Sequence, residues 1–442
     1  MLPPAELYPL VLLWVQAVGV PHATARAALA HLMTALLAGQ SLRPSALMRA
    51  LLSPDGVPAR QRSKRLRRAL DRRWLAPTWL TPRLVRAALA LVPADERGQV
   101  YLALDSVRCG PWEIYTLGVV WHGRALVVGW AVLPYPLPKG RFGPTVRDLV
   151  RRVDAAWPVG PVPHLLADRA FPSGDLFRLL GSLGWGWTVR ARATDGMRVG
   201  GERVVVRDLL AGATPGGWTA RPATFGTGPK AVPGALVIGR GLEVAPAHQA
   251  GPVSLAIRAA RAGRRERHLQ TKKPGRDGAG LRAADRWVAL FTTQPDWLRA
   301  VRSYGRRWAI EGTYRDAQGG WDGQHGWDLE PTAARLRTAA EVEALVGLWA
   351  LGALLQCWVG ARAGAADAPP AVAAARAGWT TTGRLSVWAR GKFALGDPHG
   401  RLRRWLAEAL TDGAARIAAR PAPTATAPVP ITIPATTPQL AA

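Results

Sequence analysis

The chain has 442 residues, enough for two to four structural units, which argues against a single small binding module. Lysine and arginine number 58 against 30 aspartates and glutamates, a formal net charge of +28. This excess favours a polyanion such as nucleic acid as the partner. A high-GC genome is the alternative, but it explains the choice of arginine over lysine better than it explains the shortage of acids. The chain has only two cysteines, Cys109 and Cys357, so no disulfide framework or thiolate metal site is expected. This low cysteine count is compatible with a protein of the reducing cytoplasm.

Residues 1–95 carry apolar positions at helical spacing without strand alternation, which predicts an all-helical N-terminal domain. The chain is expected to begin with a helix rather than a secretory signal, because the basic leader and the cleavage site are missing. Within this domain, residues 59–74 hold eight cations and one acid, Asp71. Like charges repel unless a polyanion is near, so we expect DNA contacts here that include Arg65 and Arg68. A solvated helix face is the alternative.

Residues 96–193 predict a sheet with helices on its faces. Apolar runs at 99–107 and 113–134 indicate three strands, the last two joined by a tight turn. The segments that follow are a helix, a strand, a helix with Ser173 as its cap, and a strand, at 145–157, 164–171, 173–184 and 185–193. This order describes an α/β domain with a mixed sheet.

The region 194–282 is rich in glycine and proline and predicts a β-rich insertion, with a very basic stretch at 258–276. Strand character resumes at 286–293 and a helix follows, so residues 283–330 predict the second part of the sheet domain. Residues 331–420 predict a helical C-terminal region, and 421–442 predict a disordered Pro/Ala/Thr tail.

One segment, residues 344–361, is apolar and about as long as a membrane span. A membrane helix and a buried core helix are both compatible with that length. Gln356 within the segment and the nearby Glu341 and Glu343 favour the core helix, so no membrane partner is expected.

Two aspartates, Asp105 and Asp168, come where apolar strands are predicted to end. Ends of neighbouring strands place their side chains at a common edge of the sheet, where loops build sites. Two carboxylates brought together repel each other, and Mg²⁺ would compensate them because carboxylate oxygens are its preferred ligands. Each aspartate also has a local alternative: Asp105 could cap a turn through Ser106, and Asp168 could pair with Arg169.

Glu311, in "RSYGRRWAIEGTYRDAQGG" at 302–320, is the candidate third carboxylate. At about 100° per residue, one narrow stripe of a single helix would hold four side chains: Tyr304, Arg307, Glu311 and Gln318. A third carboxylate would complete a pair of metal ions able to clamp the attacking and leaving oxygens of a phosphodiester. The alternative is a surface helix stabilised by the Arg307–Glu311 pair at i, i+4.

These residues match a known family. An aspartate after a strand, a second followed by arginine and an aromatic residue, and a helix reading Tyr-x2-Arg-x3-Glu resemble the bacterial insertion-sequence transposases of the DDE class. The similarity is greatest to the IS-four family with its Y-R-E-K signature, and "WVALFTTQPDWLRAVRSYGRRWAIEGTYRDAQGG" is the most specific piece. The resemblance covers nearly the whole chain. It implies an RNase-H-like mixed sheet, interrupted by the β-rich insertion and flanked by the helical N- and C-terminal domains.

The resemblance also implies a role for each matching position. Asp105, Asp168 and Glu311 would bind two Mg²⁺ ions, which Mn²⁺ could replace, and would catalyse DNA cleavage and strand transfer. DNA contacts would be made by Tyr304, Arg307, Arg315, Gln318 and Trp287, the last by stacking on a flipped base. Gln318 departs from the family, which has lysine there, and this removes a cation from the phosphate contact.

The implied partners are double-stranded DNA, as transposon ends and target, and a second copy of the chain on paired ends. The implied location is the bacterial cytoplasm, at the nucleoid when DNA is bound. Two alternatives stay open: a decayed or repurposed transposase that only binds DNA, for which Gln318 is the argument, and a metal-dependent nuclease of the same fold.

Overall fold

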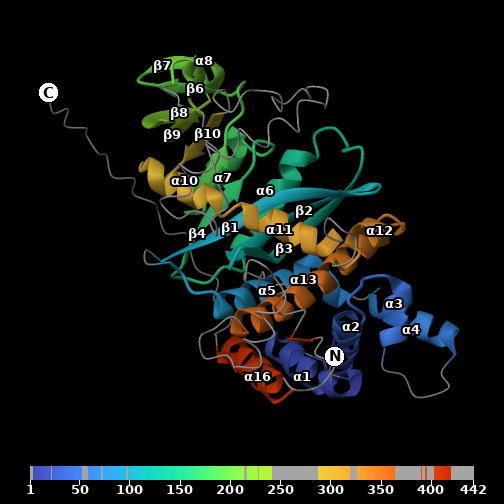
Figure 1. Cartoon of the computed structure of the whole chain (residues 1–442). Helices are drawn as coiled ribbons and strands as arrows, with labels where there is room; N and C mark the ends of the chain where they lie inside the picture. Colours follow the sequence, from blue (N-terminus) through green and yellow to red (C-terminus); the bar gives the residue numbers. More distant parts are fainter. Residues whose placement is uncertain are drawn as a thin grey trace, which may run out of the picture.

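The computed structural model (Figure 1) describes residues 3–20, 22–51, 58–70, 73–95, 98–213, 217–226, 228–240, 287–318, 326–363, 390, 394–395 and 403–419. These residues form an α/β structure around a ten-stranded mixed sheet, with helices on both faces of its central strands and a larger helical group at one end. The α/β class and the mixed sheet predicted from the sequence are confirmed.

The N-terminal domain is helical in its described residues, as predicted. Proline occupies the first turn of α1, α3 and α5, where its missing N–H would have no partner within the helix and its φ already suits one. Apolar residues at helical spacing turn one side of each helix inward. The elements are α1 (Pro4–Ala17), α2 (Ala23–Gly39), α3 (Pro44–Ala50), α4 (Ala59–Leu70), η1 (Arg73–Leu75) and α5 (Pro77–Leu91).

The sheet has the strand order β3-β2-β1-β4-β5-β10-β9-β8-β6-β7. β4 pairs parallel with both β1 and β5, and the other neighbours are antiparallel. The central strands are β1 (Gln99–Cys109), β2 (Trp112–Trp121), β3 (Arg124–Pro134), β4 (Val162–Ala167), β5 (Gly186–Arg190) and β10 (Trp287–Thr292). The three hairpin strands and the later strands of the prediction are therefore confirmed.

The turn between β2 and β3 is made by His122 and Gly123, with φ of 47° and 75°. Positive φ at two consecutive residues is the geometry of a two-residue hairpin turn, because its twist matches that of the strands. This turn lies next to β3 residues that hold α11, so it contributes to the site described below.

Helices cover both faces of the central strands: α6 (Phe142–Asp154), α7 (Gly174–Ser182), α10 (Trp297–Gly305) and α11 (Trp308–Gln318). Side chains alternate along β10: Phe291 contacts Phe177 of α7, whereas Val288 and Leu290 pack with α10. α7 and α10 thus lie on opposite faces. Ser173 caps α7 by accepting a hydrogen bond from the Leu176 N–H, as predicted.

The region 194–282, predicted to be a β-rich insertion, contains four strands in the residues that the structure describes. Its described elements are β6 (Gly196–Val199), β7 (Glu202–Val205), the short helix α8 (Val206–Ala211), β8 (Trp218–Phe225) and β9 (Val232–Arg240). β9 pairs with β10, so the insertion extends the central sheet instead of forming a separate one. The helix α8 was not predicted, and the basic stretch at 258–276 lies outside the described residues.

The C-terminal region contributes α12 (Leu329–Ala333), α13 (Ala339–Arg362) and α16 (Arg403–Ala419). α16 packs against α1, and α13 lies between the sheet and the N-terminal helices, so the helices α13 and α16 form one helical group with the N-terminal helices (Figure 1). α13 is long and apolar enough to cross a membrane, but 94% of its apolar window is buried inside the structure. The prediction of a core helix is confirmed. The predicted tail at 421–442 lies outside the described residues.

Candidate active site

Two aspartates lie where the parallel pairing of β1 and β4 ends. The last register pair is Leu104 with Ala167, so Asp105 and Asp168 are the next residues on their strands. The prediction that Asp105 closes its strand is wrong: β1 continues to Cys109, because its last residues stay paired with β2 after β4 has ended. Asp168 does follow directly on β4. The register therefore brings the two carboxylates to one edge of the parallel strands.

The helix that carries the candidate glutamate is broken. The prediction of one continuous helix with a single stripe is wrong for Tyr304, Arg307, Glu311 and Gln318: Tyr304 belongs to α10, and Glu311 and Gln318 belong to α11. α10 ends at Gly305, and the N–H groups of Arg306 and Arg307 bond to carbonyls three residues back at 3.0 and 2.9 Å. These tighter bonds turn the chain before α11 begins. Arg307 lies in this break, and its side chain points to Asp105 and Glu311.

Arg307, in the break, is the cation that the carboxylates share. Its side chain is only 5% exposed, and Nη2 donates to Glu311 Oε1 at 2.6 Å while Nη1 lies 3.4 Å from Asp105 Oδ2. Burial alone would lower the pKa of this guanidinium, but Tyr304, Glu311, Asp168 and Asp105 raise it above its usual value. Arg307 is therefore a buried cation held by several acidic groups.

Asp105 is a carboxyl group with a raised pKa. Burial raises its pKa to about 6, an effect that Arg307 and the Ser106 N–H partly offset and that Asp168 and Glu311 add to. The Ser106 N–H lies 2.8 Å from Oδ1. The contact with Ser106 considered from the sequence is thus present, but it caps no turn, because both residues lie within β1.

Asp168 is held more loosely. The Tyr304 hydroxyl lies 3.4 Å from its Oδ1, and Arg190 Nη1 lies 3.9 Å from the same oxygen. The sequence analysis did not identify Arg190 as a residue of the site. Its position at the end of β5, the strand next to the one that precedes Asp168, could have indicated it.

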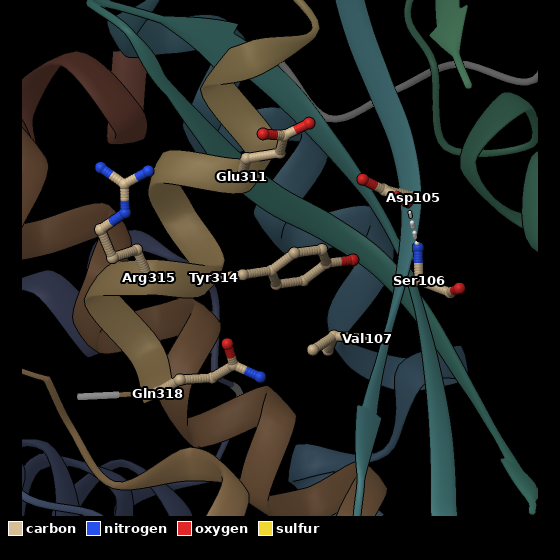
Figure 2. Close-up of a pocket in the computed structure, with 7 residues that line it drawn as sticks. All are labelled: Asp105, Ser106, Val107, Glu311, Tyr314, Arg315 and Gln318. Carbon is tan, nitrogen blue, oxygen red and sulfur yellow. Dashed lines mark hydrogen bonds between the residues drawn. The ribbon is translucent and has the colours of Figure 1, made fainter. Parts of the chain in front are cut away.

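Asp105 and Glu311 open onto a pocket of about 520 Å³ between β1 and α11 (Figure 2). Its lining is formed by Asp105, Ser106, Val107, Glu311, Tyr314, Arg315 and Gln318. Of the predicted DNA contacts, Arg315 is exposed and points away from β1, and Gln318 lies at the end of the pocket opposite Glu311 (Figure 2). The sequence reasoning missed Tyr314, which lies between these ends.

The other predicted DNA contacts are placed differently. Tyr304 and Arg307 are 3% and 4% exposed, so neither presents a free surface to DNA in this conformation. Trp287 opens β10 as predicted, but it is half-buried and packs against the main core. Arg65 and Arg68 are on α4, which packs against α2, α3 and α13 in the helical group, away from the carboxylates.

The carboxylate oxygens of Asp105, Asp168 and Glu311 are the type of ligand that a hard divalent cation prefers, and they lie near one pocket. Their present arrangement does not form a metal centre: among the described residues, no group of three His, Cys, Asp or Glu side chains is placed to hold a metal ion. Asp105 and Glu311 are directed at Arg307 instead. The metal site remains a prediction.

The raised pKa of Asp105 predicts a pH-dependent cost in stability. A carboxyl group that binds its proton more tightly in the folded state favours folding at low pH, and this contribution is lost as pH rises through about 6. Asp105→Asn, which carries no charge, should raise the free energy of unfolding at pH 8 by about 3 kcal/mol or less. The difference should vanish near pH 4, as measured by thermal unfolding with EDTA.

The matched control is Asp148→Asn, an exposed aspartate of α6 that pairs with Arg151 across one helical turn. It should change the stability by no more than about 0.5 kcal/mol at either pH. A lower Tm for Asp105→Asn than for the wild type at pH 8 would show that attraction to Arg307 outweighs the burial of the charge.

Neither a scan against protein-family models nor a search of curated proteins gives a match to this chain.

Proposed function

We propose that the chain is a DDE transposase that cuts and joins DNA at the ends of an insertion sequence. The observation that carries the proposal is the meeting of Asp105, Asp168 and Glu311 around the buried Arg307, from segments far apart in the sequence. A lone ion pair on a surface helix would need neither of the two aspartates.

The fold agrees with this proposal without deciding it. Three antiparallel strands, followed along the chain by α6, β4, α7 and β5, with β4 parallel to both β1 and β5, are the arrangement expected for an RNase-H-like sheet. The motif that resembles the Y-R-E-K signature spans the break between α10 and α11. The insertion extends this sheet through β9 and β10.

Asp105, Asp168 and Glu311 are the residues that would hold Mg²⁺, or Mn²⁺ in its place. When bound, such ions supply charge neutralisation and an activated water for phosphodiester hydrolysis. In the free protein Arg307 neutralises part of this charge. If a conformational change exposed Arg307, a DNA phosphate would compete for its guanidinium and release Asp105 and Glu311, so DNA would favour metal binding.

The charge of the chain supports double-stranded DNA as the partner, because +28 allows many phosphate contacts with release of counterions. Arg315 is exposed on α11 beside the carboxylates, and Arg60, Lys64 and Arg67 are exposed on α4. These two surfaces would let one part of the chain hold DNA while another cuts it. A homodimer on paired ends would bring two such sites together.

A specific observation favours a second candidate, a DNA-binding protein without catalysis. Arg307 occupies the space between Asp105 and Glu311, and Gln318 stands at the position where the family has lysine. A nuclease of the same fold, which hydrolyses DNA without joining it, is the third candidate.

Strand transfer separates these candidates. The substrate is a labelled duplex carrying the inverted repeat expected beside the reading frame, with Mg²⁺ and a target plasmid. The wild type should nick and join it, and Asp168→Ala should lose both activities by at least about 100-fold, because a metal-binding carboxylate is gone. The control is Asp412→Ala, on α16 and paired with Arg416. Equal product from Asp168→Ala would overturn the assignment, and nicking without joining would indicate the nuclease.

Gln318 provides a gain-of-function test. Gln318→Lys places a cation at the end of the pocket opposite Glu311, where it could contact a DNA phosphate. We expect nicking at low DNA concentration to increase several-fold, by about 1 kcal/mol of added phosphate binding. Gln318→Met, of similar length but uncharged, is the control. If lysine and methionine give the same rate, the missing cation does not limit this chain.

A further inference from the structure

The helix α11 is fixed to the sheet by buried polar contacts close to Glu311. The Thr313 hydroxyl oxygen accepts a hydrogen bond from the Ala125 N–H at 2.8 Å. Asp316 forms an ion pair with Arg124, and both side chains are largely buried. These contacts attach one side of α11 to the start of β3.

Gly312 lets this attachment be close. A Cβ atom at this position would lie 2.8 Å from Arg124 Nη1 and 3.4 Å from the Gly123 carbonyl oxygen. A larger residue would displace the Arg124 guanidinium, which pairs with Asp316. Glycine therefore lets this ion pair lie close against α11 at the residue directly after Glu311.

A separate contact joins α11 to β2, directly beside Asp105. The hydroxyls of Tyr314 and Thr116 share a buried hydrogen bond of 2.6 Å. Thr116 is the cross-strand partner of Asp105, so their side chains lie on the same face of the sheet. Tyr314 is three residues after Glu311 and therefore its neighbour on the helix surface. Figure 2 shows its ring reaching from α11 to β1 between Glu311 and Gln318.

We propose that the Tyr314–Thr116 hydrogen bond is a positioning element of the active site, which sets the separation of Glu311 and Asp105. This buried bond links Tyr314, one helical turn after Glu311, to Thr116, the residue opposite Asp105 on the neighbouring strand. The inference rests on the proposed function. It concerns Tyr314, which lines the pocket, and its buried partner Thr116, and neither residue carries any of the proposed chemistry.

The test removes one hydroxyl at a time. Tyr314→Phe and Thr116→Val should each lower kcat for nicking by about 10-fold or more, since small displacements of reacting groups are costly. KM for DNA should stay within about twofold, because neither residue is a DNA contact. The double variant should be no slower than the slower single one, as expected for two halves of one interaction. Thr116→Ser keeps a hydroxyl and should recover most of the rate.

The matched control is Tyr115→Phe, the same substitution one residue away on β2. The Tyr115 hydroxyl is buried and has no hydrogen-bond partner among the described residues, so its removal breaks no such bond. Its kcat should equal that of the wild type. If Tyr115→Phe is as slow as Tyr314→Phe, or if the two hydroxyl deletions add in full, the positioning role is overturned.

A second readout needs no turnover. Mn²⁺ affinity, measured by electron paramagnetic resonance with bound DNA, should fall at least about fivefold in Tyr314→Phe and stay unchanged in Tyr115→Phe. An active wild type with unchanged Tyr314→Phe overturns only this inference. A wild type that joins no DNA but shows the Mn²⁺ effect overturns the transposase and supports the positioning role. A wild type that neither cuts DNA nor binds Mn²⁺ overturns both.

Discussion

The ion pairs of Arg307 are the interaction on which the rest of the site depends. Its guanidinium is buried and lies 2.6 Å from Glu311 and 3.4 Å from Asp105. A buried cation without partners would cost several kcal/mol, and two neighbouring, partly buried carboxylates without a cation would repel each other. Each group therefore makes the burial of the others possible. The break between α10 and α11 matters because it is where the chain turns Arg307 inward, toward the end of the parallel ladder.

The same arrangement gives a physical reason for coupling between DNA and metal in the proposed enzyme. Arg307 and a divalent cation would compete for Asp105 and Glu311, whereas Arg307 and a phosphate attract each other. A protein free of DNA would then bind metal weakly and hydrolyse little. The hydrogen bonds of Thr313 and Tyr314 hold α11 on the sheet without involving Arg307 or the carboxylates. The carboxylate side chains could therefore turn from Arg307 to a metal ion without moving the helix.

The sequence predicted those parts of the fold that depend on local pattern. The hairpin at His122 and Gly123, the Ser173 cap and the buried helix α13 all follow from turn chemistry or hydrophobicity. The sequence predicted that Asp105 and Asp168 lie close together at one edge of the sheet. It did not predict that the strand of Asp105 continues to Cys109. Helical periodicity assumed an unbroken helix, so the turn after Gly305 and the burial of Arg307 were missed. Arg190 and Tyr314 depend on which strands become neighbours, and periodicity does not report that.

The central claim is that Asp105, Asp168 and Glu311 form a metal site that DNA makes available. Mn²⁺ binding followed by electron paramagnetic resonance, with and without a short duplex of the element end, tests it directly. We expect binding at least about tenfold tighter with DNA, a coupling of about 1.4 kcal/mol. We also expect loss of this binding in Asp105→Asn and Glu311→Gln, and its retention in Glu330→Gln, an exposed residue of α12. Mn²⁺ binding that is unchanged when Asp105 or Glu311 is neutralised would contradict the account.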